Sequence, residues 1–311
     1  MNRPRLTVAV CTWNRRALLQ ETLERMTQLR PPLGGWELLV IDNNSTDGTA
    51  DVIASFEGRL PIRGVLEPQA GLSHARNRAV REGTGEYLLF TDDDVLVDLE
   101  WLVAYEAAFR AYPNAAQFGG PVEPWFEGTP PEWLTQVFDQ VGAAYAAVDH
   151  GPAAIPLDDA HLVFGANIAA RMSALQMYKF DPNLGRTGTN MLSGEETAVF
   201  AAMRRDGLTG WWVPEARVRH FVPRDRQNLR YLRRWHSGVG RYQGMEPAAL
   251  GERALLSVPL WVWRQMIEYG ARYCVDRVVG SPRAWVRDVS YFASAWGYFR
   301  GRRMARRRAE C

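Results

Sequence analysis

Short apolar runs and amphipathic stretches alternate over the first hundred residues of the chain. The apolar runs predict four β-strands, at residues 6–13, 36–43, 61–68 and 86–94. Apolar residues at helical spacing between them predict three helices, at residues 16–29, 45–56 and 72–82. Strands that alternate with helices in this way predict an α/β fold with a doubly wound, mainly parallel sheet. Ligands bind to such sheets at the carboxyl ends of the strands.

The pattern is less regular after Asp98. It predicts a helix in WLVAYEAAFRAY, and strands in FGGPVEPW, VFGANIAARM and WWVPEARVRHFV. A Gly-rich loop from Arg186 is predicted to lead into a helix that ends near Arg205, and residues 127–160 show no clear period. From Leu229 onward the pattern is helical, aromatic and basic. We therefore predict one α/β domain at residues 1–225 and a helical, basic C-terminal extension at residues 226–311.

Composition places the chain among soluble globular proteins, because 47% of its 311 residues are hydrophobic. Its three cysteines, Cys11, Cys274 and Cys311, are too widely spaced for a disulfide framework or a zinc site. The apolar run at the start is too short for a signal peptide, and we expect no membrane-spanning helix. These features predict a cytoplasmic protein.

Charge is unevenly distributed along the chain, although the net charge is only +2. Residues 217–311 contain 20 Arg and 7 acidic residues, whereas residues 1–216 contain 17 basic and 28 acidic residues. An arginine-rich tail indicates an anionic partner, either a membrane surface or a nucleic acid. No recognition fold for nucleic acid accompanies the arginines, so we expect no nucleic-acid partner.

Three consecutive aspartates, Asp92, Asp93 and Asp94, end the fourth predicted strand. Alternate residues of an extended segment point the same way, so Asp92 and Asp94 are predicted to face one side and Asp93 the other. Carboxylates at the ligand-binding edge of the sheet suit Mg²⁺ or Mn²⁺, which bridges to phosphate oxygens. The alternative is a solvated turn in which Asp94 or Asp98 caps the next helix.

Two further positions near strand ends are candidates for nucleotide binding. Asp42 directly follows the second strand, where a carboxylate can accept hydrogen bonds from a nucleobase or from ribose hydroxyls. The alternative is a turn in which Asp42, Asn43 or Ser45 caps the next helix. Arg76, near the start of the third predicted helix, is a candidate for binding the nucleotide or its phosphates.

Glu195 and Glu196 lie together at a predicted helix start. Acidic residues there interact favourably with the helix dipole, and the alternative is a carboxylate that deprotonates a hydroxyl. His220 ends a predicted strand. A lone histidine is more often a core residue than a ligand, so His220 becomes a metal-ligand candidate only if it lies near Asp94.

The order of these motifs resembles that of the family 2 glycosyltransferases, which bind nucleotide sugars on a GT-A fold. The resemblance runs from Leu6 to about Arg241, through VAVCTWNR, LLVIDNNSTDGT, GLSHARNRAVREGTGEYLLFTDDDV, GANIAA, SGEET and VRHFV. Its most specific element is ARNR-x-x-x-x-G-x-GEYLLFTDDD. The resemblance implies a GT-A-type, Rossmann-like sheet, with a nucleotide-binding half at residues 1–100 and an acceptor-side half at residues 101–225.

The resemblance also implies a role for each matching position. Asp94 would be the more direct metal ligand, with Asp92 nearer the ribose and His220 as a late ligand of the metal or diphosphate. Glu196 takes the catalytic base position. The family commonly has Glu-Asp where this chain has Glu195-Glu196, which leaves the choice between the two acids open. The nucleotide sugar would be bound by Thr12, Asn14, Arg15, Asp42, Asn44, Arg76, Asp92, Asp93, Gly165 and Asn167.

The implied activity is metal-dependent, inverting transfer of a sugar from a nucleoside-diphosphate sugar to an acceptor hydroxyl, with Mn²⁺ or Mg²⁺ as cofactor. The implied context is the assembly of a cell-surface polysaccharide or glycoconjugate, with a sugar or lipid-linked sugar as acceptor. One alternative is a nucleotidyltransferase that forms nucleotide sugars. Such enzymes usually need a Gly-rich phosphate loop, which TWNRR lacks. The other is a non-catalytic nucleotide-sugar-binding protein of the same fold.

Aromatic residues and arginines are interleaved in the segment from Leu255 to Val279. This pattern predicts a segment that lies on an anionic membrane surface, which would make the protein peripheral on the inner face of the membrane. The same pattern is typical of a helical subdomain that packs its aromatic residues against the catalytic core.

Overall fold

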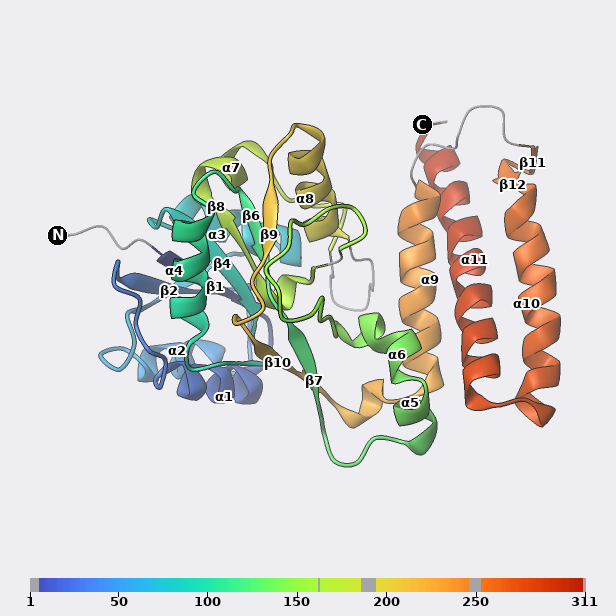
Figure 1. Ribbon diagram of the computed structural model, residues 1–311, viewed down its shortest axis with the longest axis horizontal. Helices are drawn as coiled ribbons and strands as arrows, with labels where there is room; N and C mark the ends of the chain where they lie inside the picture. Colours follow the sequence, from blue (N-terminus) through green and yellow to red (C-terminus); the bar gives the residue numbers. More distant parts are fainter. Residues whose placement is uncertain (1–5, 162, 186–193, 246–252, 310–311) are drawn as a thin grey trace. The chain divides into compact units, whose positions relative to one another are not determined.

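The chain forms two compact units in the computed structural model, which describes residues 6–161, 163–185, 194–245 and 253–309 (Figure 1). The described part of the first unit is residues 6–125, 146–161, 163–185 and 195–221. The second unit contains residues 126–145, Gly194, 222–245 and 253–309. Its final segment begins close to the predicted boundary at residue 225. Residues 126–145, which we had expected within the domain 1–225, belong to the second unit.

The first unit is built on a sheet of seven described strands in the order β3-β2-β1-β4-β8-β6-β9. The strands are β1 (Leu6–Thr12), β2 (Trp36–Asp42), β3 (Ile62–Leu66), β4 (Tyr87–Asp92), β6 (Gln117–Gly119), β8 (Ile168–Arg171) and β9 (Gly210–Trp212). β3, β2, β1 and β4 are parallel, and β8 runs antiparallel to both β4 and β6. The prediction of an α/β fold with a mainly parallel sheet is therefore confirmed.

Helices cover both faces of this sheet, as expected for strands that read as nearly continuous apolar runs. One face packs against α1 (Arg16–Met26), α2 (Thr49–Ser55) and α4 (Trp101–Ala111). The other face packs against α3 (Leu72–Glu82), α7 (Met172–Met177) and α8 (Glu195–Arg205). Successive residues of β1 point to opposite faces, so Val8 and Val10 join the first core cluster and Ala9 joins the second.

A smaller sheet of three described strands has the order β5-β10-β7. Its strands are β5 (Val95–Val97), β7 (Val122–Phe126) and β10 (Val218–Val222). The prediction of one strand across WWVPEARVRHFV was wrong, because β9 and β10 belong to different sheets and residues 213–217 connect them. Pro214 lies in this connection, where a missing backbone N–H removes no sheet hydrogen bond.

Some predicted boundaries also differ from those of the structure. In GANIAA the segment η2 (Gly165–Asn167) is a 3₁₀ turn, and β8 begins only at Ile168. α2 begins at Thr49 rather than at residue 45, after Gly48 with a left-handed φ of 86°. Residues 186–193 of the predicted Gly-rich loop lie outside the described residues.

The described elements of the second unit include three long helices. They are α9 (Leu229–Met245), α10 (Leu260–Val279) and α11 (Pro282–Ala309), with the short elements α5 (Glu132–Gln136), α6 (Phe138–Val141), η1 (Gly142–Tyr145), η3 (Arg224–Arg226), β11 (Ala254–Leu255) and β12 (Val258–Pro259). The prediction of a helical C-terminal region is confirmed. No helix in the described ranges has both the length and the apolar sequence needed to cross a membrane.

α9 and α11 pack with their backbones in close contact. A Cβ added at Gly240 of α9 would overlap the carbonyl oxygen of Ser294, and one at Gly297 of α11 would overlap that of Ser237. Glycines four residues further along each helix, Gly244 and Gly301, make equivalent contacts. Glycine at these spacings lets two helices approach more closely than any side chain would allow.

Candidate active site

The carboxyl ends of β1, β2 and β4 meet at one edge of the central sheet. In the parallel register Thr12 pairs with Asp42, and Cys11 pairs with Asp92. This is the edge at which ligands bind to doubly wound sheets. The positions predicted from three separate motifs therefore lie side by side.

Asp92, Asp94 and His220 form a cluster that can hold a metal ion. Each offers one ligand atom, and these atoms lie within 4.8 Å of one another. The Nε2 atom of His220 is 3.4 Å from the Oδ1 atom of Asp94. The condition that the sequence set for His220, proximity to Asp94, is met. Two carboxylate oxygens and one imidazole nitrogen are a donor set that fits a divalent cation.

Strand pairing explains how His220 reaches the aspartates. The chain turns after Asp92 and continues as β5, which pairs antiparallel with β10 so that Val95 lies opposite His220. The backbone N–H of Phe221 donates to the carbonyl oxygen of Asp94 at 2.9 Å. The small sheet therefore fixes the histidine beside the turn that carries the carboxylates.

Asp93 contacts a different set of side chains. Its carboxylate accepts hydrogen bonds from Thr12 Oγ1 at 2.7 Å and from Arg15 at 2.9 Å, and Arg15 also contacts Asp94 at 2.6 Å. Burial raises the pKa of Asp93 to about 7. Arg15 acts against this rise, and the neighbouring charge of Asp94 adds to it. Thr22 donates to the carbonyl oxygen of Asp93 at 3.0 Å and holds the turn in place. Arg15 thus contacts both of these adjacent carboxylates and neutralises part of their combined charge.

The loops after β1 and β2 are tied to each other. The backbone N–H of Asn14 donates to Ser45 Oγ at 2.9 Å, and Asn14 Oδ1 accepts from the N–H of Thr46 at 2.7 Å. Asp42 Oδ1 accepts from the N–H of Ser45 at 2.9 Å, so the turn that the sequence offered as an alternative is present. It does not cap the next helix, because α2 begins at Thr49 after Gly48 and has no side-chain cap. Asn14 and Asn44 both have left-handed backbone, with φ of 51° and 67°. Asparagine tolerates this conformation better than most residues do.

Arg76 lies in a buried cluster with the two glutamates. Its Nη1 atom is 2.8 Å from Glu195 and 3.4 Å from Glu196, and the side chains of Arg76, Glu195 and Glu196 are 3%, 3% and 13% exposed. The backbone N–H of Gly165 donates to Glu196 Oε1 at 3.3 Å. A Cβ on Gly165 would overlap the Arg76 guanidinium, which explains the glycine at this position. Arg76 therefore supports the acid pair.

The two glutamates share one arginine, so their pKa values move apart. Burial, and then repulsion from Glu196, raise the pKa of Glu195 against the effect of Arg76. Burial alone would raise the pKa of Glu196, but Arg76 and the Gly165 N–H outweigh it, so this pKa is lowered. Burial would lower the pKa of Arg76, but the two glutamates and Asp92 raise it. The effect of Asp92 on Arg76 links the acid pair to the metal-ligand cluster electrostatically.

Asn167 has a structural role that the sequence did not predict. Its Oδ1 atom accepts hydrogen bonds from Trp101 Nε1 and Tyr105 Oη, both at 2.9 Å. Its Nδ2 atom donates to the carbonyl oxygens of Pro121 at 2.9 Å and Ala216 at 2.6 Å. The side chain is fully buried and every donor and acceptor is used, so its polar atoms are already engaged within the protein. The prediction that Asn167 contributes to nucleotide-sugar binding stays a prediction.

Two residues at this edge were not singled out as binding residues from the sequence. Asn43 donates to the carbonyl oxygens of Glu67 and Gln69 and accepts from the N–H of Gly71, which fixes the entry into α3. The available signal was an amide directly after a strand. Trp13, between two predicted binding residues, is 50% exposed. Nothing in the apolar pattern distinguishes it from a core residue.

A comparison with known families identifies the family of the chain. Residues 7–176 match the model of Glycosyl transferase family 2. The chain belongs to this family. It is 28% identical over 263 residues to the succinoglycan biosynthesis protein ExoM of Rhizobium meliloti (strain 1021). This alignment covers 82% of this chain and 80% of ExoM. It is 29% identical over 145 residues to the putative teichuronic acid biosynthesis glycosyltransferase TuaG of Bacillus subtilis (strain 168), covering 43% of this chain and 56% of the relative.

Solved structures show the same fold. The mannosyltransferase PcManGT from Pyrobaculum calidifontis, in complex with GDP-Man and Mn²⁺, matches with a TM-score of 0.58 and 20% identity, over 94% of this chain and 86% of that one. S. aureus TarS 1-349 in complex with UDP-GlcNAc matches with a TM-score of 0.51 and 13% identity, over 95% and 91%. At these identities the likeness concerns the fold, which is GT-A. The protein is a family 2 glycosyltransferase with this fold, as the motifs had implied.

Proposed function

We propose that this glycosyltransferase transfers a sugar from a nucleoside-diphosphate sugar to an acceptor hydroxyl, with inversion of configuration and with a divalent cation. The observation that supports this most directly is the placement of two clusters at one edge of the sheet. One is the Asp92–Asp94–His220 cluster, and the other is the buried acid pair on Arg76. An enzyme that displaces a nucleoside diphosphate needs charge neutralisation at the leaving group and a base for the acceptor.

Asp92, Asp94 and His220 are the residues that would hold the cation. When bound, a divalent cation neutralises the charge that develops on the departing diphosphate. Thr12, Asn14 and Asp42, which meet at the same strand ends, bind the nucleoside in this proposal. Arg15 lies on Asp93 and Asp94, where it is placed to contact the diphosphate as well.

Glu196 is the base in this proposal. Arg76 keeps its pKa low, so the carboxylate is ionised at neutral pH, and it is more exposed than Glu195. It accepts the proton of the acceptor hydroxyl while the hydroxyl oxygen bonds to the anomeric carbon. The bond from that carbon to the diphosphate oxygen breaks at the same time, which releases the nucleoside diphosphate. A single displacement of this kind inverts the anomeric configuration.

The test is a screen of nucleotide sugars for release of nucleoside diphosphate, with Mn²⁺, with Mg²⁺ and with EDTA. We expect turnover of one donor that is lost in EDTA and in Asp94→Ala. Glu196→Gln should lower kcat by about 10²-fold or more while the donor still binds, because only proton removal is lost. Asp51→Asn, an exposed acid on α2, is the matched control and should retain full activity.

Two results would overturn the proposal. One is turnover that persists undiminished in EDTA and in Asp94→Ala. The other is failure of every donor to bind with Mn²⁺ in calorimetry, which would leave the aspartates as turn residues. Formation of a nucleotide sugar from a nucleoside triphosphate would indicate a nucleotidyltransferase instead.

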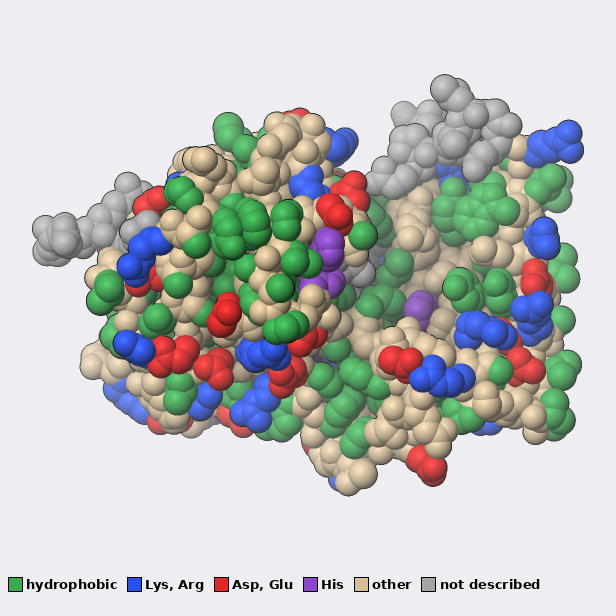
Figure 2. Space-filling view, viewed as in Figure 1, with side chains coloured by type: hydrophobic (Ala, Val, Ile, Leu, Met, Phe, Trp, Pro, Cys, Tyr) green, Lys and Arg blue, Asp and Glu red, His purple; other side chains and the backbone are tan. Residues whose placement is uncertain are grey.

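We also propose that the helical C-terminal unit contacts an anionic membrane surface, from which a lipid-linked sugar acceptor is reached. α10 packs aromatic residues against α11. The ring centroids of Trp263 and Phe299 are 5.3 Å apart, and the stacked rings of Tyr269 and Tyr291 have centroids 4.7 Å apart. Apolar side chains nevertheless remain exposed on α10, including Ile267, Val275, Val278 and Val279. Figure 2 shows apolar and basic side chains intermixed over these helices. This combination suits the boundary between lipid tails and anionic headgroups.

A further inference from the structure

A pocket of about 480 Å³ lies in the second unit, between α9 and α11. Five arginines line it: Arg230, Arg233, Arg234 and Arg241 from α9, and Arg300 from α11. Arg233 and Arg234 follow Arg230 by three and four positions, and Arg241 follows Arg234 by seven, which places these arginines along one side of that helix. A volume of several hundred Å³ is in the range of small-molecule sites rather than of single ions.

The lining of this pocket is basic, and none of the described residues that form it is acidic. Within the described ranges, no carboxylate forms an ion pair with Arg230, Arg233 or Arg300. Other arginines of the same unit do have such partners. Arg272 pairs with Glu268 on α10, and Arg283 pairs with Asp139.

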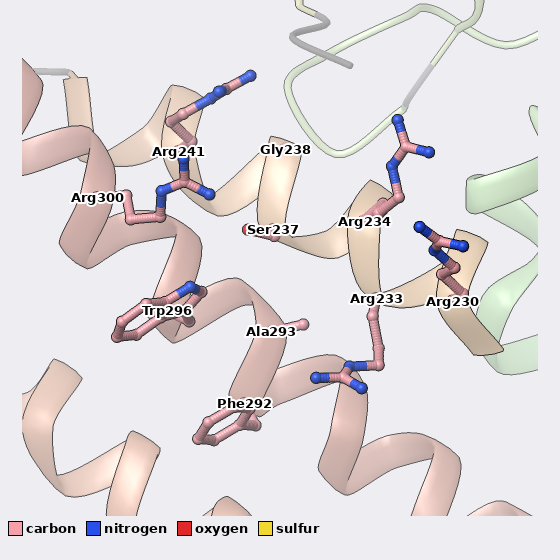
Figure 3. Close-up of a pocket in the computed structure, with 10 residues that line it drawn as sticks. All are labelled: Arg230, Arg233, Arg234, Ser237, Gly238, Arg241, Phe292, Ala293, Trp296 and Arg300. Carbon is pink, nitrogen blue, oxygen red and sulfur yellow. The ribbon is translucent and has the colours of Figure 1, made fainter. Parts of the chain in front are cut away.

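The cations also lie close to one another. Figure 3 shows Arg241 of α9 and Arg300 of α11 at the same end of the pocket, where the two helices face each other. Burial, and then the charge of Arg300, lower the pKa of Arg241. Like charges held this close repel each other, and a bound anion with several oxygens removes that repulsion.

The close approach of the helices shapes the floor of the pocket. The contact of Gly297 with the backbone at Ser237 brings α11 against α9, and Gly238 and Ala293 are buried beneath the arginines. Small residues at these positions leave room above the floor that larger side chains would fill. The cavity is therefore a direct result of how the two helices pack.

Aromatic surface borders the cations on the α11 side. Phe292 is half-buried and Trp296 is 43% exposed, and both line the pocket. In Figure 3 Arg233 extends from α9 toward Phe292 and Ala293. A free phosphate would use only the arginines. An apolar group attached to the phosphate would also use the rings.

We propose that this pocket is a binding site for the phosphate or diphosphate group of an amphiphilic ligand, a lipid phosphate. Arg233, Arg241 and Arg300 contact the phosphate oxygens, and Phe292 and Trp296 pack against the attached hydrocarbon. Arginine suits this role because its planar fork of donors pairs with two phosphate oxygens at once. None of the lining residues belongs to the Asp92–Asp94–His220 cluster, and all of them are part of the second unit.

The test is calorimetry on the full chain in EDTA, with inorganic diphosphate and with water-soluble geranyl diphosphate as probes. EDTA removes diphosphate binding that depends on a metal at the aspartates. We expect geranyl diphosphate to bind at least about fivefold more tightly than inorganic diphosphate, because only the former contacts the rings. The double variant Arg233→Gln/Arg300→Gln should weaken both probes by about tenfold or more.

Two further variants separate the parts of the proposal. Trp296→Ala should remove the preference for geranyl diphosphate and leave inorganic diphosphate unchanged. Arg205→Gln/Arg253→Gln removes the same charge from exposed arginines outside the pocket and should bind both probes like the wild type. A metal-dependent donor assay on all variants shows separately whether the proposed transfer activity holds.

Each contrary result overturns a stated part. Equal affinity for the two probes would show a site for free phosphate compounds and not for lipids. If the pocket variant and the control variant weaken probe binding equally, the probes are attracted by the general positive charge of the protein and not by a specific site. Absence of binding to the wild type would remove the site altogether.

Discussion

A single guanidinium, that of Arg76, forms ion pairs with two carboxylates in the candidate active site, those of Glu195 and Glu196. One positive charge neutralises one carboxylate, so the pair keeps a proton to a higher pH than an isolated glutamate would. The structure assigns the raised pKa to Glu195 and the lowered pKa to Glu196. The more exposed glutamate is therefore the one that is ready to accept a proton.

This arrangement predicts how stability changes with pH. The folded state holds the Glu195 proton more tightly than the unfolded state does, because the pKa rises from 4.5 to about 7. The resulting stabilisation is fully present below about pH 4.5 and is lost as the pH rises through about 7. Glu195→Gln cannot titrate. The stability of the wild type relative to this variant should therefore fall by roughly 1–3 kcal/mol between about pH 5 and pH 8.

Chemical denaturation at the two pH values measures this difference. Glu57→Gln, which removes an exposed carboxylate, is the matched control measured at the same two pH values. A constant difference for Glu195→Gln would mean that Arg76 keeps both glutamates ionised in the folded state.

Sequence motifs identified most of the residues of the candidate site but not how they are connected. Asp92 and Asp94 could be paired from the alternation of an extended segment, whereas the role of His220 depended on a strand pairing that no local pattern encodes. For Asn167 the motif did not reveal the structural role of the side chain. A motif position suggested a ligand, but four hydrogen bonds from distant segments make it part of the core.

At the scale of elements, the sequence predicted the local β-α-β units well. The strands β1 to β4 and the helix Leu72–Glu82 agree with the apolar periodicity, because each is formed by near neighbours in the chain. The split between β9 and β10 was missed, since alternation continues through both and only tertiary pairing assigns them to two sheets. The close contact of α9 with α11 also could not be predicted, because it joins segments far apart in the sequence.

The contact between α9 and α11 predicts a sharp difference between two glycines. Gly297→Ala should destabilise the protein by about 2 kcal/mol or more, because the new methyl overlaps the carbonyl oxygen of Ser237 and the backbones must separate. Gly270→Ala on α10 is the control. Its methyl meets only the Phe292 ring, at 3.3 Å, and alanine favours the helix, so its effect should stay within about 1 kcal/mol.

Thermal and chemical unfolding of the two variants test this contact. Similar small effects at both positions would mean that the helices adjust without cost, and that their close approach does not depend on glycine.

At the scale of the whole molecule, the uneven charge has a functional reading. The acidic residues concentrate before residue 217 and the arginines after it. In the proposal above, the acidic part holds a cation and the basic part contacts anionic lipid. Long-range attraction of this kind is screened by salt, whereas apolar contact with lipid is not.

The membrane proposal predicts that the full chain floats with vesicles that contain phosphatidylglycerol. Binding should increase with the fraction of anionic lipid and weaken from about 50 mM to about 500 mM salt. Val278→Asp/Val279→Asp should reduce it strongly, because both side chains are exposed on α10. Leu33→Asp, an equally exposed apolar residue of the first unit, should have no effect. Equal binding to neutral vesicles, or none to anionic ones, would contradict the proposal.

The pairing of β5 with β10 also has a consequence for the newly made chain. The ribosome releases the aspartates of the metal-ligand cluster early, whereas His220 emerges only after β9. The strands β1 to β4 can form while synthesis continues, but His220, the third ligand in the proposed cation site, joins them last. A nascent chain can therefore form its first β-α units before the proposed cation site is complete, so under the proposed function catalytic competence comes only after β10 has been made.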